Sequence, residues 1–271
     1  MALRSSFLPI CCSVGFLFLA EGRAAAQAGL GFFHPLQSCD PQVVKTCEMA
    51  PSDGKEHVHT FVVNGLDPMQ LANLNGMTAY LRKLGFSQTH YEPLLGYRST
   101  MRQIRAIRQS DPDAKIVLVG YSLGAQVVRR LANDLEKENI MVDRLVYLGG
   151  DFIGNSQSSR PGNVAKVVNI RGHGSLFSGY DLFWNGAEID NAENVKLDSR
   201  HFVLPSRGQT METLASTLAS LAQDSHEAIA ARTLKEQPIP GQPENQFAEK
   251  SPLEAHPVSR TRQGTEPAPK P

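Results

Sequence analysis

The sequence predicts an α/β fold, in which a mostly parallel central sheet is covered by helices on both faces. Between residues 57 and 223, short apolar runs alternate with segments whose apolar residues recur at helical spacing, and this alternation is typical of parallel sheets. The run Ile116 to Val119 contains no polar residue, as expected for a strand buried on both faces. Right-handed crossovers would place the carboxyl ends of the strands at one edge, where ligands of such sheets bind.

The first half of this alternation has clear element boundaries. Residues 57–63 (HVHTFVV) form a candidate strand, and a tight turn follows at 64–68, where Asn, Gly and Pro gather. Residues 69–84 place their leucines on one helical face, and Gly85 is suited to end that helix. Residues 86–91 are a second candidate strand. A helix over 99–109 would be capped by Ser99 and would end before Asp111-Pro112.

The second half continues the pattern. A helix over 127–135 follows the apolar run, with its apolar residues on one face. The segments 142–148 (VDRLVYL), 165–170 (AKVVNI) and 194–197 are short and apolar enough to be strands. Residues 212–221 predict a final amphipathic helix, which could continue to residue 234.

Composition allows one folded domain with a segment on either side. The chain has 271 residues, with 27 Lys and Arg against 27 Asp and Glu, so its formal net charge is zero. This balance gives no sign of a nucleic-acid partner. We assign the domain to residues 55–235. Residues 236–271 are rich in Pro, Gln and Glu and too poor in large apolar groups to offset the entropy of ordering, so we expect a disordered tail.

The amino terminus has the features of a secretory signal over residues 1–26. Arg4 supplies the positive charge, residues 7–20 form an apolar stretch too short to span a bilayer comfortably, and three alanines end at Ala26. We therefore expect an exported protein, periplasmic or secreted, with no stable membrane span once the signal is removed.

Residues 27–54 show no clear periodicity and are expected to form an irregular arm. They contain Cys39 and Cys47. An even pair of cysteines in an exported protein predicts a disulfide, and two free thiols are the alternative. Neither cysteine belongs to a His or Cys cluster with zinc-ligand spacing, so the sequence predicts no metal.

The motif Gly120-Tyr121-Ser122-Leu123-Gly124 lies between the apolar run and the helix that follows it. A chain that passes from strand to helix without a loop must turn sharply, and the glycines remove Cβ atoms that would block the turn. Ser122 would then lie at the tip, above a helix N-terminus that favours negative charge. This G-x-S-x-G segment resembles the nucleophile elbow of the α/β-hydrolases. The resemblance implies hydrolysis through an acyl-enzyme on Ser122, without metal or organic cofactor.

The family order of nucleophile, acid and base implies the partners of Ser122. His201 follows the last candidate strand and precedes the last helix, where the family carries its histidine; His173, His226 and His256 are weaker choices. For the acid, Asp181 follows the strand at 165–170. Asp151 follows the preceding strand and is the alternative.

Two backbone N–H groups should form the oxyanion hole, since the tetrahedral intermediate carries a negative oxygen. One is that of Leu123, directly after the nucleophile. By resemblance the other comes from Leu66, in the loop after the first strand, with Asp67 as the neighbouring alternative. This chain has Asn64-Gly65 where many lipases carry His-Gly.

These features together predict an exported serine hydrolase that cleaves a carboxylic ester, with a small-molecule or lipid ester as substrate. Apolar and aromatic residues in 151–162 and 173–194 could accept an acyl chain or could pack a small domain. A thioesterase or amidase of the same fold is the first alternative. The second is a catalytically silent α/β-hydrolase-like binding protein, since a fold does not guarantee its usual activity.

Overall fold

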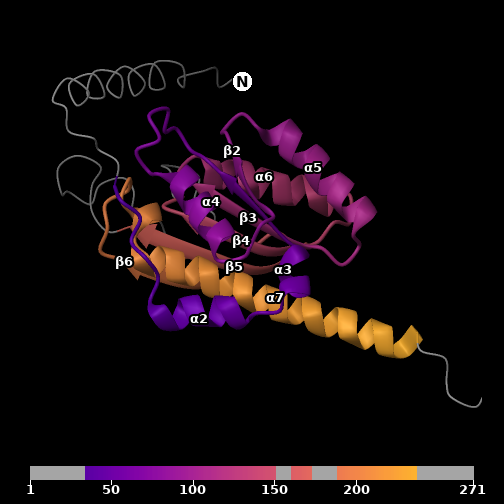
Figure 1. Ribbon diagram of the computed structural model, residues 1–271. Helices are drawn as coiled ribbons and strands as arrows, with labels where there is room; N and C mark the ends of the chain where they lie inside the picture. The colour runs from indigo at the N-terminus through magenta and orange to yellow at the C-terminus, as the bar shows by residue number, and fades with distance from the viewer. Residues whose placement is uncertain (1–33, 151–159, 173–187, 237–271) are drawn as a thin grey trace, which may run out of the picture.

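Six parallel strands form the centre of the computed structural model, in the spatial order β2-β1-β3-β4-β5-β6 (Figure 1). The structure describes residues 34–150, 160–172 and 188–236. The predicted fold class is confirmed, and every strand pair is parallel. The strands are β1 (Val58–Val63), β2 (Thr89–Glu92), β3 (Lys115–Tyr121), β4 (Val142–Leu148), β5 (Val164–Gly172) and β6 (Glu193–Leu197).

The register brings the carboxyl ends of the central strands to one edge. Val63 at the end of β1 is the partner of Gly120 in β3, and Tyr121 at the end of β3 is the partner of Leu148 in β4. Loops that follow these three strands therefore emerge side by side. The segments that begin at residues 64, 122 and 149 are brought together although they are far apart in the sequence.

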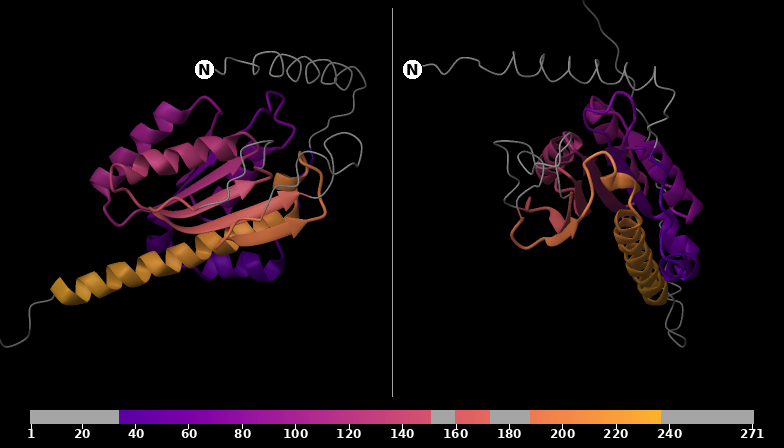
Figure 2. Two further views of the ribbon diagram at one scale, coloured as in Figure 1. Left: turned by 180° about the vertical axis from the view of Figure 1, so that it is seen from behind. Right: turned by 90° about the vertical axis from the view of Figure 1, so that its left-hand side faces the viewer.

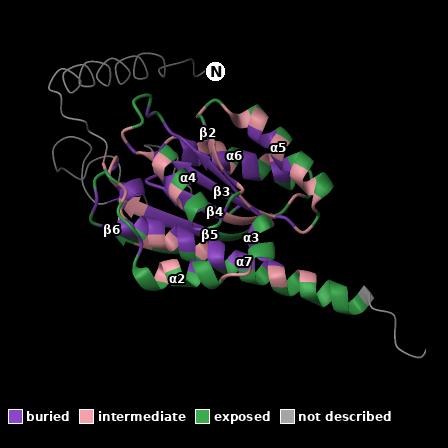
Figure 3. Ribbon diagram, in the orientation of Figure 1, coloured by how far each residue is buried: buried purple, intermediate pink, exposed green. Residues whose placement is uncertain are grey.

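One face of the sheet is covered by α4 (Leu74–Lys83) and α7 (Gly208–Glu236), as the views in Figures 1 and 2 show. Alternate strand residues, including Val62, Val119 and Val146, share a buried cluster with residues of these two helices. Burial of this apolar surface is the main contribution that holds the helices to the sheet. Figure 3 shows the strands as the most buried part of the molecule.

The opposite face is covered by α5 (Tyr97–Ser110) and α6 (Gly124–Glu136). Their apolar stripes pack on the other set of alternate strand residues, among them Phe61, Leu118 and Leu145. A strand such as β3, whose side chains alternate between two buried clusters, must be apolar throughout. The continuous run at 116–119 is thus explained by burial on both faces.

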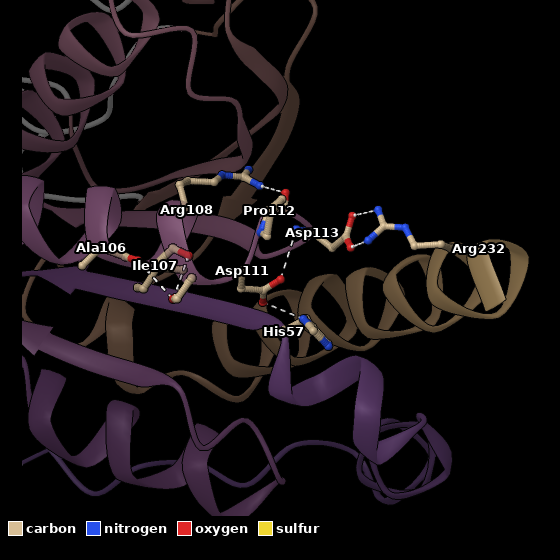
Figure 4. Close-up of polar contacts among 9 residues, drawn as sticks. His57, Ala106, Ile107, Arg108, Asp111, Pro112, Asp113 and Arg232 are labelled. Carbon is tan, nitrogen blue, oxygen red and sulfur yellow. Dashed lines mark hydrogen bonds and ion pairs between the residues drawn. The ribbon is translucent and has the colours of Figure 1, made fainter. Parts of the chain in front are cut away.

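Helix α7 extends beyond the sheet at its carboxyl end, where Figure 3 shows it exposed. Near this end Arg232 pairs with Asp113, with the closest atoms 2.5 Å apart, in the loop that leads into β3 (Figure 4). In the same loop Asp111 contacts the imidazole of His57 at 2.6 Å and accepts the N–H of Asp113 at 3.1 Å. These contacts lie at the amino edge of the sheet, opposite the edge described above.

The arm expected to be irregular contains two helices, α2 (Pro41–Met49) and α3 (Ser52–Glu56). Asp40 caps α2 by accepting the N–H of Gln42 at 2.7 Å, and Pro41 stands at the first helical position. Both are sequence signals for a helix start that the expectation of an irregular arm overlooked. The two helices pack on α7.

The predicted disulfide is wrong for this structure, in which Cys39 and Cys47 are free, buried thiols. Cys39 precedes the cap of α2, and Cys47 lies within that helix. The Cys47 thiol instead donates to the Ala215 carbonyl at 3.6 Å, and burial raises its pKa to about 11.

Two of the helix starts that differ from the sequence prediction have a visible cause in the residues before them. Helix α4 begins at Leu74 instead of residue 69, because residues 64–73 form a longer loop in which Gln70 and Asn73 both have positive φ. Helix α5 begins after Gly96, so Ser99 lies inside it and is not its cap. Gly85 has a φ of +100°, as expected for the residue that ends α4.

Several predictions fall outside the described residues. The signal at 1–26, most of the tail at 236–271, and both candidate acids, Asp151 and Asp181, belong to this group. Among the helices that the structure describes, none has the length and apolar character needed to cross a membrane.

Candidate active site

Ser122 occupies a sharp turn directly between β3 and α6. Its φ is +53°, a left-handed value that a residue with a Cβ seldom adopts. Its N–H donates to the Leu148 carbonyl at 3.0 Å, and its own carbonyl accepts the N–H of Ala125 at 3.0 Å. The strand ladder on one side and the first turn of the helix on the other thus hold Ser122 in a strained conformation, which is a common property of functional residues.

The glycines on either side of Ser122 permit close packing around the turn. A Cβ on Gly120 would lie 2.5 Å from a methyl group of Val128, and one on Gly124 would overlap the carbonyl oxygen of Val63. Helix α6 can therefore approach β1 and β3 closely. The amino terminus of α6 lies directly beside Ser122, and its dipole favours negative charge there.

The loop after β1 lies directly against Ser122. A Cβ on Gly65 would lie 2.7 Å from the Cβ of Ser122, 2.6 Å from the carbonyl oxygen of Tyr121 and 3.1 Å from the Leu123 nitrogen. Leu66 is the next residue, and its side chain is 40% exposed. The structure thus brings the two segments that carry the candidate oxyanion donors, Leu66 and Leu123, to the same place.

His201 reaches this edge of the sheet from the loop between β6 and the short helix η1 (Leu204–Ser206). Its ring stacks on the Tyr121 ring, with centroids 4.9 Å apart. A Cβ on Gly149 would lie only 3.0 Å from His201 Nδ1, so the imidazole packs against the residue that follows Leu148. Because Leu148 accepts the N–H of Ser122, the imidazole of His201 packs against the end of β4, next to the end of β3 where Ser122 lies.

Burial determines the charge of this imidazole. His201 is 4% exposed, and desolvation lowers its pKa to about 4. The ring is therefore neutral at pH 7, and a neutral imidazole nitrogen can accept a proton from a hydroxyl. Ser122 itself keeps 8% of its surface exposed.

Two residues around His201 were missed by the sequence analysis. Tyr121 holds the imidazole by stacking, and Gly149 provides the space for it with a φ of +56°. The Gly149-Gly150 pair at the end of a strand is a sequence signal that another side chain packs closely against the backbone there. Nothing in the sequence around Tyr121 indicated its partner, which is 80 residues away.

No cluster of His, Cys, Asp and Glu residues suited to a metal ion occurs in the described parts of the chain. The roles assigned to Ser122, His201, Leu66 and Leu123 stay predictions, as does the choice between Asp181 and Asp151 for the acid.

Comparison with known proteins finds neither a matching family model nor a matching curated protein. Solved structures do match. A predicted CIB-like hydrolase from Thermoplasma acidophilum is 12% identical, covering 60% of this chain and 86% of its own, at a TM-score of 0.39. The NocB thioesterase domain from the nocardicin cluster is 11% identical, covering 60% and 94%, also at 0.39.

A putative hydrolase of the α/β superfamily from Xanthomonas campestris pv. campestris is 13% identical at a TM-score of 0.35, covering 62% of this chain and 98% of its own. At these identities and TM-scores, the matches are likenesses and assign no role to any residue of this chain.

Proposed function

We propose that this protein is an exported serine hydrolase that cleaves a carboxylic ester through an acyl-enzyme on Ser122. The observation that carries the proposal is the position of Ser122. It has a φ of +53°, the loop at Gly65 packs against it, and the His201 loop reaches the adjacent strand end. A serine hydroxyl with a neutral imidazole within reach of its proton is the arrangement that nucleophilic catalysis requires.

In the first half of the reaction, Ser122 Oγ attacks the ester carbonyl carbon and His201 accepts the hydroxyl proton. The carbonyl oxygen becomes negative, and the N–H groups of Leu66 and Leu123 donate to it. Collapse of this intermediate breaks the bond to the alcohol oxygen, which leaves with the proton from His201. Each oxyanion donor is worth on the order of 3 kcal/mol of barrier reduction.

In the second half, water attacks the acyl-enzyme with His201 as the base, and the acid is released from Ser122. A carboxylate that accepts the second N–H of His201 would orient the ring and stabilise its charged form. Asp181 is our choice for this carboxylate and Asp151 the alternative. Because burial disfavours the charged imidazole, such a partner is needed more here than at an exposed histidine.

The substrate is proposed to be a small-molecule or lipid ester that the protein meets outside the cytoplasm. Support for the location comes from the signal-like residues 1–26. Support for an apolar acyl group comes from the exposed side chains of Leu66 and Met69 on the loop beside Ser122.

A serine-directed fluorophosphonate probe tests the nucleophile. We expect it to label the wild-type protein at Ser122, and we expect labelling to be absent from the Ser122→Ala variant. Ser110→Ala, which changes an exposed serine at the end of α5, is the matched control and should be labelled normally. A folded wild-type protein that is not labelled would favour the catalytically silent binding protein.

A series of p-nitrophenyl esters of increasing chain length then measures the acyl preference. Matched thioester and amide substrates separate an esterase from a thioesterase or amidase, because all three share the acyl-enzyme chemistry. Greater kcat/KM for the thioester than for the ester of the same acid would contradict the proposed substrate class.

A further inference from the structure

Asp67 is a buried carboxylate in the loop between β1 and α4. It is 4% exposed, and both of its oxygens are occupied. Oδ1 accepts the N–H of Leu71 at 2.9 Å, and Oδ2 accepts the N–H of Ala72 at 2.9 Å. A single side chain therefore closes this loop on itself through two charge-assisted hydrogen bonds.

The backbone of Asp67 is also anchored. Its carbonyl accepts the N–H of Gln70 at 3.1 Å and the side-chain amide of Asn64 at 3.3 Å. The same Asn64 amide donates to the Tyr91 hydroxyl at 3.1 Å, while Asn64 Oδ1 accepts the N–H of Gly65 at 2.8 Å. Leu66 thus lies between two residues, Gly65 and Asp67, that are each fixed by hydrogen bonds.

Stability alone does not account for a charge at this position. Burial raises the pKa of Asp67, so desolvation of the carboxylate outweighs the hydrogen bonds from Ala72, Leu71 and Gln70. A raised carboxyl pKa means that the ionised group is less favourable in the folded protein than in the unfolded chain. Burial raises the pKa of the Tyr121 phenol, and the negative charge of Asp67 raises it further.

The loop must be held in place because it touches the nucleophile. A Cβ on Gly65 would lie 2.7 Å from the Cβ of Ser122, so the backbone next to Leu66 is in van der Waals contact with Ser122. A donor acts on an oxyanion only when it lies about 2.7–3.1 Å from that oxygen. A loop that moves by about 1 Å would lose this geometry.

We propose that Asp67 is a positioning residue, whose carboxylate fixes residues 64–72 so that the Leu66 N–H faces the developing oxyanion. The proposal rests on the proposed function of Ser122. The Asp67 carboxylate is occupied by these hydrogen bonds and does not touch the substrate. It acts through the amides of Leu71 and Ala72, which determine the shape of the loop.

Replacement by asparagine isolates this role. Asp67→Asn keeps the size of the side chain but leaves one oxygen, so one of the two amides would face the NH2 group, which cannot accept its hydrogen bond. The variant also removes a desolvated charge, which offsets the lost hydrogen bond in the free energy of unfolding. A change in catalysis without a loss of stability is the signature expected of a positioning residue.

Asp111→Asn is the matched control. Asp111 also accepts a backbone N–H, that of Asp113, and contacts His57, but it lies at the amino edge of the sheet (Figure 4). The seven-residue strand β3 separates Asp111 from Ser122, which corresponds to about 20 Å at ~3.3 Å per residue.

The experiment measures kcat and KM with a p-nitrophenyl ester, the rate of fluorophosphonate labelling at Ser122, and the unfolding midpoint. For Asp67→Asn we expect kcat and the labelling rate to fall by about 10- to 100-fold, KM to change less than about threefold, and the midpoint to stay or rise. For Asp111→Asn we expect kcat within about twofold of wild type.

Amide hydrogen exchange provides a readout independent of activity. In Asp67→Asn the amides of Leu71 and Ala72 should exchange faster than in the wild type, while those of β3 should not change. Exchange as slow as in the wild type, or kcat within about twofold of it, would overturn the positioning role while wild-type labelling still supports Ser122. A wild-type protein that the probe does not label would overturn the proposed function and this role together.

Discussion

The phenol of Tyr121 stacks on the imidazole of His201, and its hydroxyl donates to the backbone carbonyl of His201 at 3.3 Å. Tyr121 is completely buried and directly precedes Ser122 in the chain. One side chain thus connects the backbone of the candidate nucleophile to both the ring and the main chain of the candidate base. The relative position of Ser122 and His201 depends on this contact.

Tyr121→Phe should reduce activity modestly, because it keeps the stacked ring and removes only the hydrogen bond to the His201 loop. A neutral hydrogen bond contributes about 1 kcal/mol, so we expect kcat/KM to fall by about three- to tenfold. Tyr147→Phe, which changes an equally buried tyrosine on the opposite face of the sheet, should leave kcat/KM unchanged. If the two substitutions changed kcat/KM equally, the hydrogen bond from Tyr121 to the His201 backbone would not contribute to catalysis.

The pH dependence of kcat/KM should show a low acid limb. Catalysis needs neutral His201, and burial lowers its pKa to about 4 from the ordinary 6.5. Activity should therefore persist as pH falls below 6.5 and decrease only at more acidic pH, as the imidazole becomes protonated. A pH–rate profile of the free enzyme measures this, and an acid limb with its midpoint above 7 would contradict the assignment.

The same burial makes folding stability depend on pH. A histidine whose pKa is lowered by folding stabilises the protein fully above its unfolded value of about 6.5, and this contribution is lost as pH falls toward 4. Between pH 7 and pH 4 the wild type should lose about 3 kcal/mol more unfolding free energy than His201→Gln. Urea titrations at the two pH values measure the difference, and parallel losses in both proteins would refute it.

Gly65→Ala should damage both folding and catalysis. The new Cβ would lie 2.6 Å from the Tyr121 carbonyl oxygen and 2.7 Å from the Ser122 Cβ, so the loop must move away from the nucleophile. We expect a loss of about 1–3 kcal/mol in stability and a fall in kcat of at least about tenfold. Gly208→Ala at the start of α7 has more room and should retain activity.

Asp181→Asn and Asp151→Asn decide between the two candidate acids. The true partner of His201 orients the imidazole and stabilises its charged form, so its replacement should reduce kcat by up to about 10⁴-fold. We expect the larger loss for Asp181→Asn. If only Asp151→Asn is inactive, the acid follows β4 instead of β5.

The elbow and the succession of strands and helices along the chain were open to prediction because both are local properties. Whether residues 116–135 form a strand, a turn and a helix depends on apolar runs and on the glycines around Ser122, all within 20 residues. The sequence also indicated which histidine follows the last strand. The start of α4 was misplaced because the hydrogen bonds of Asp67 override helical periodicity over residues 69–73.

By itself, then, the sequence determined the fold class, the position of the sharp turn and the order of the elements around it. Only the tertiary structure decided which side chains meet there. Tyr121 and Gly149 contact His201, Gly65 contacts Ser122, and the two cysteines are free thiols. The physical reason is that sheet register and helix packing bring together residues far apart in the chain, and neither leaves a periodic pattern at the residues concerned.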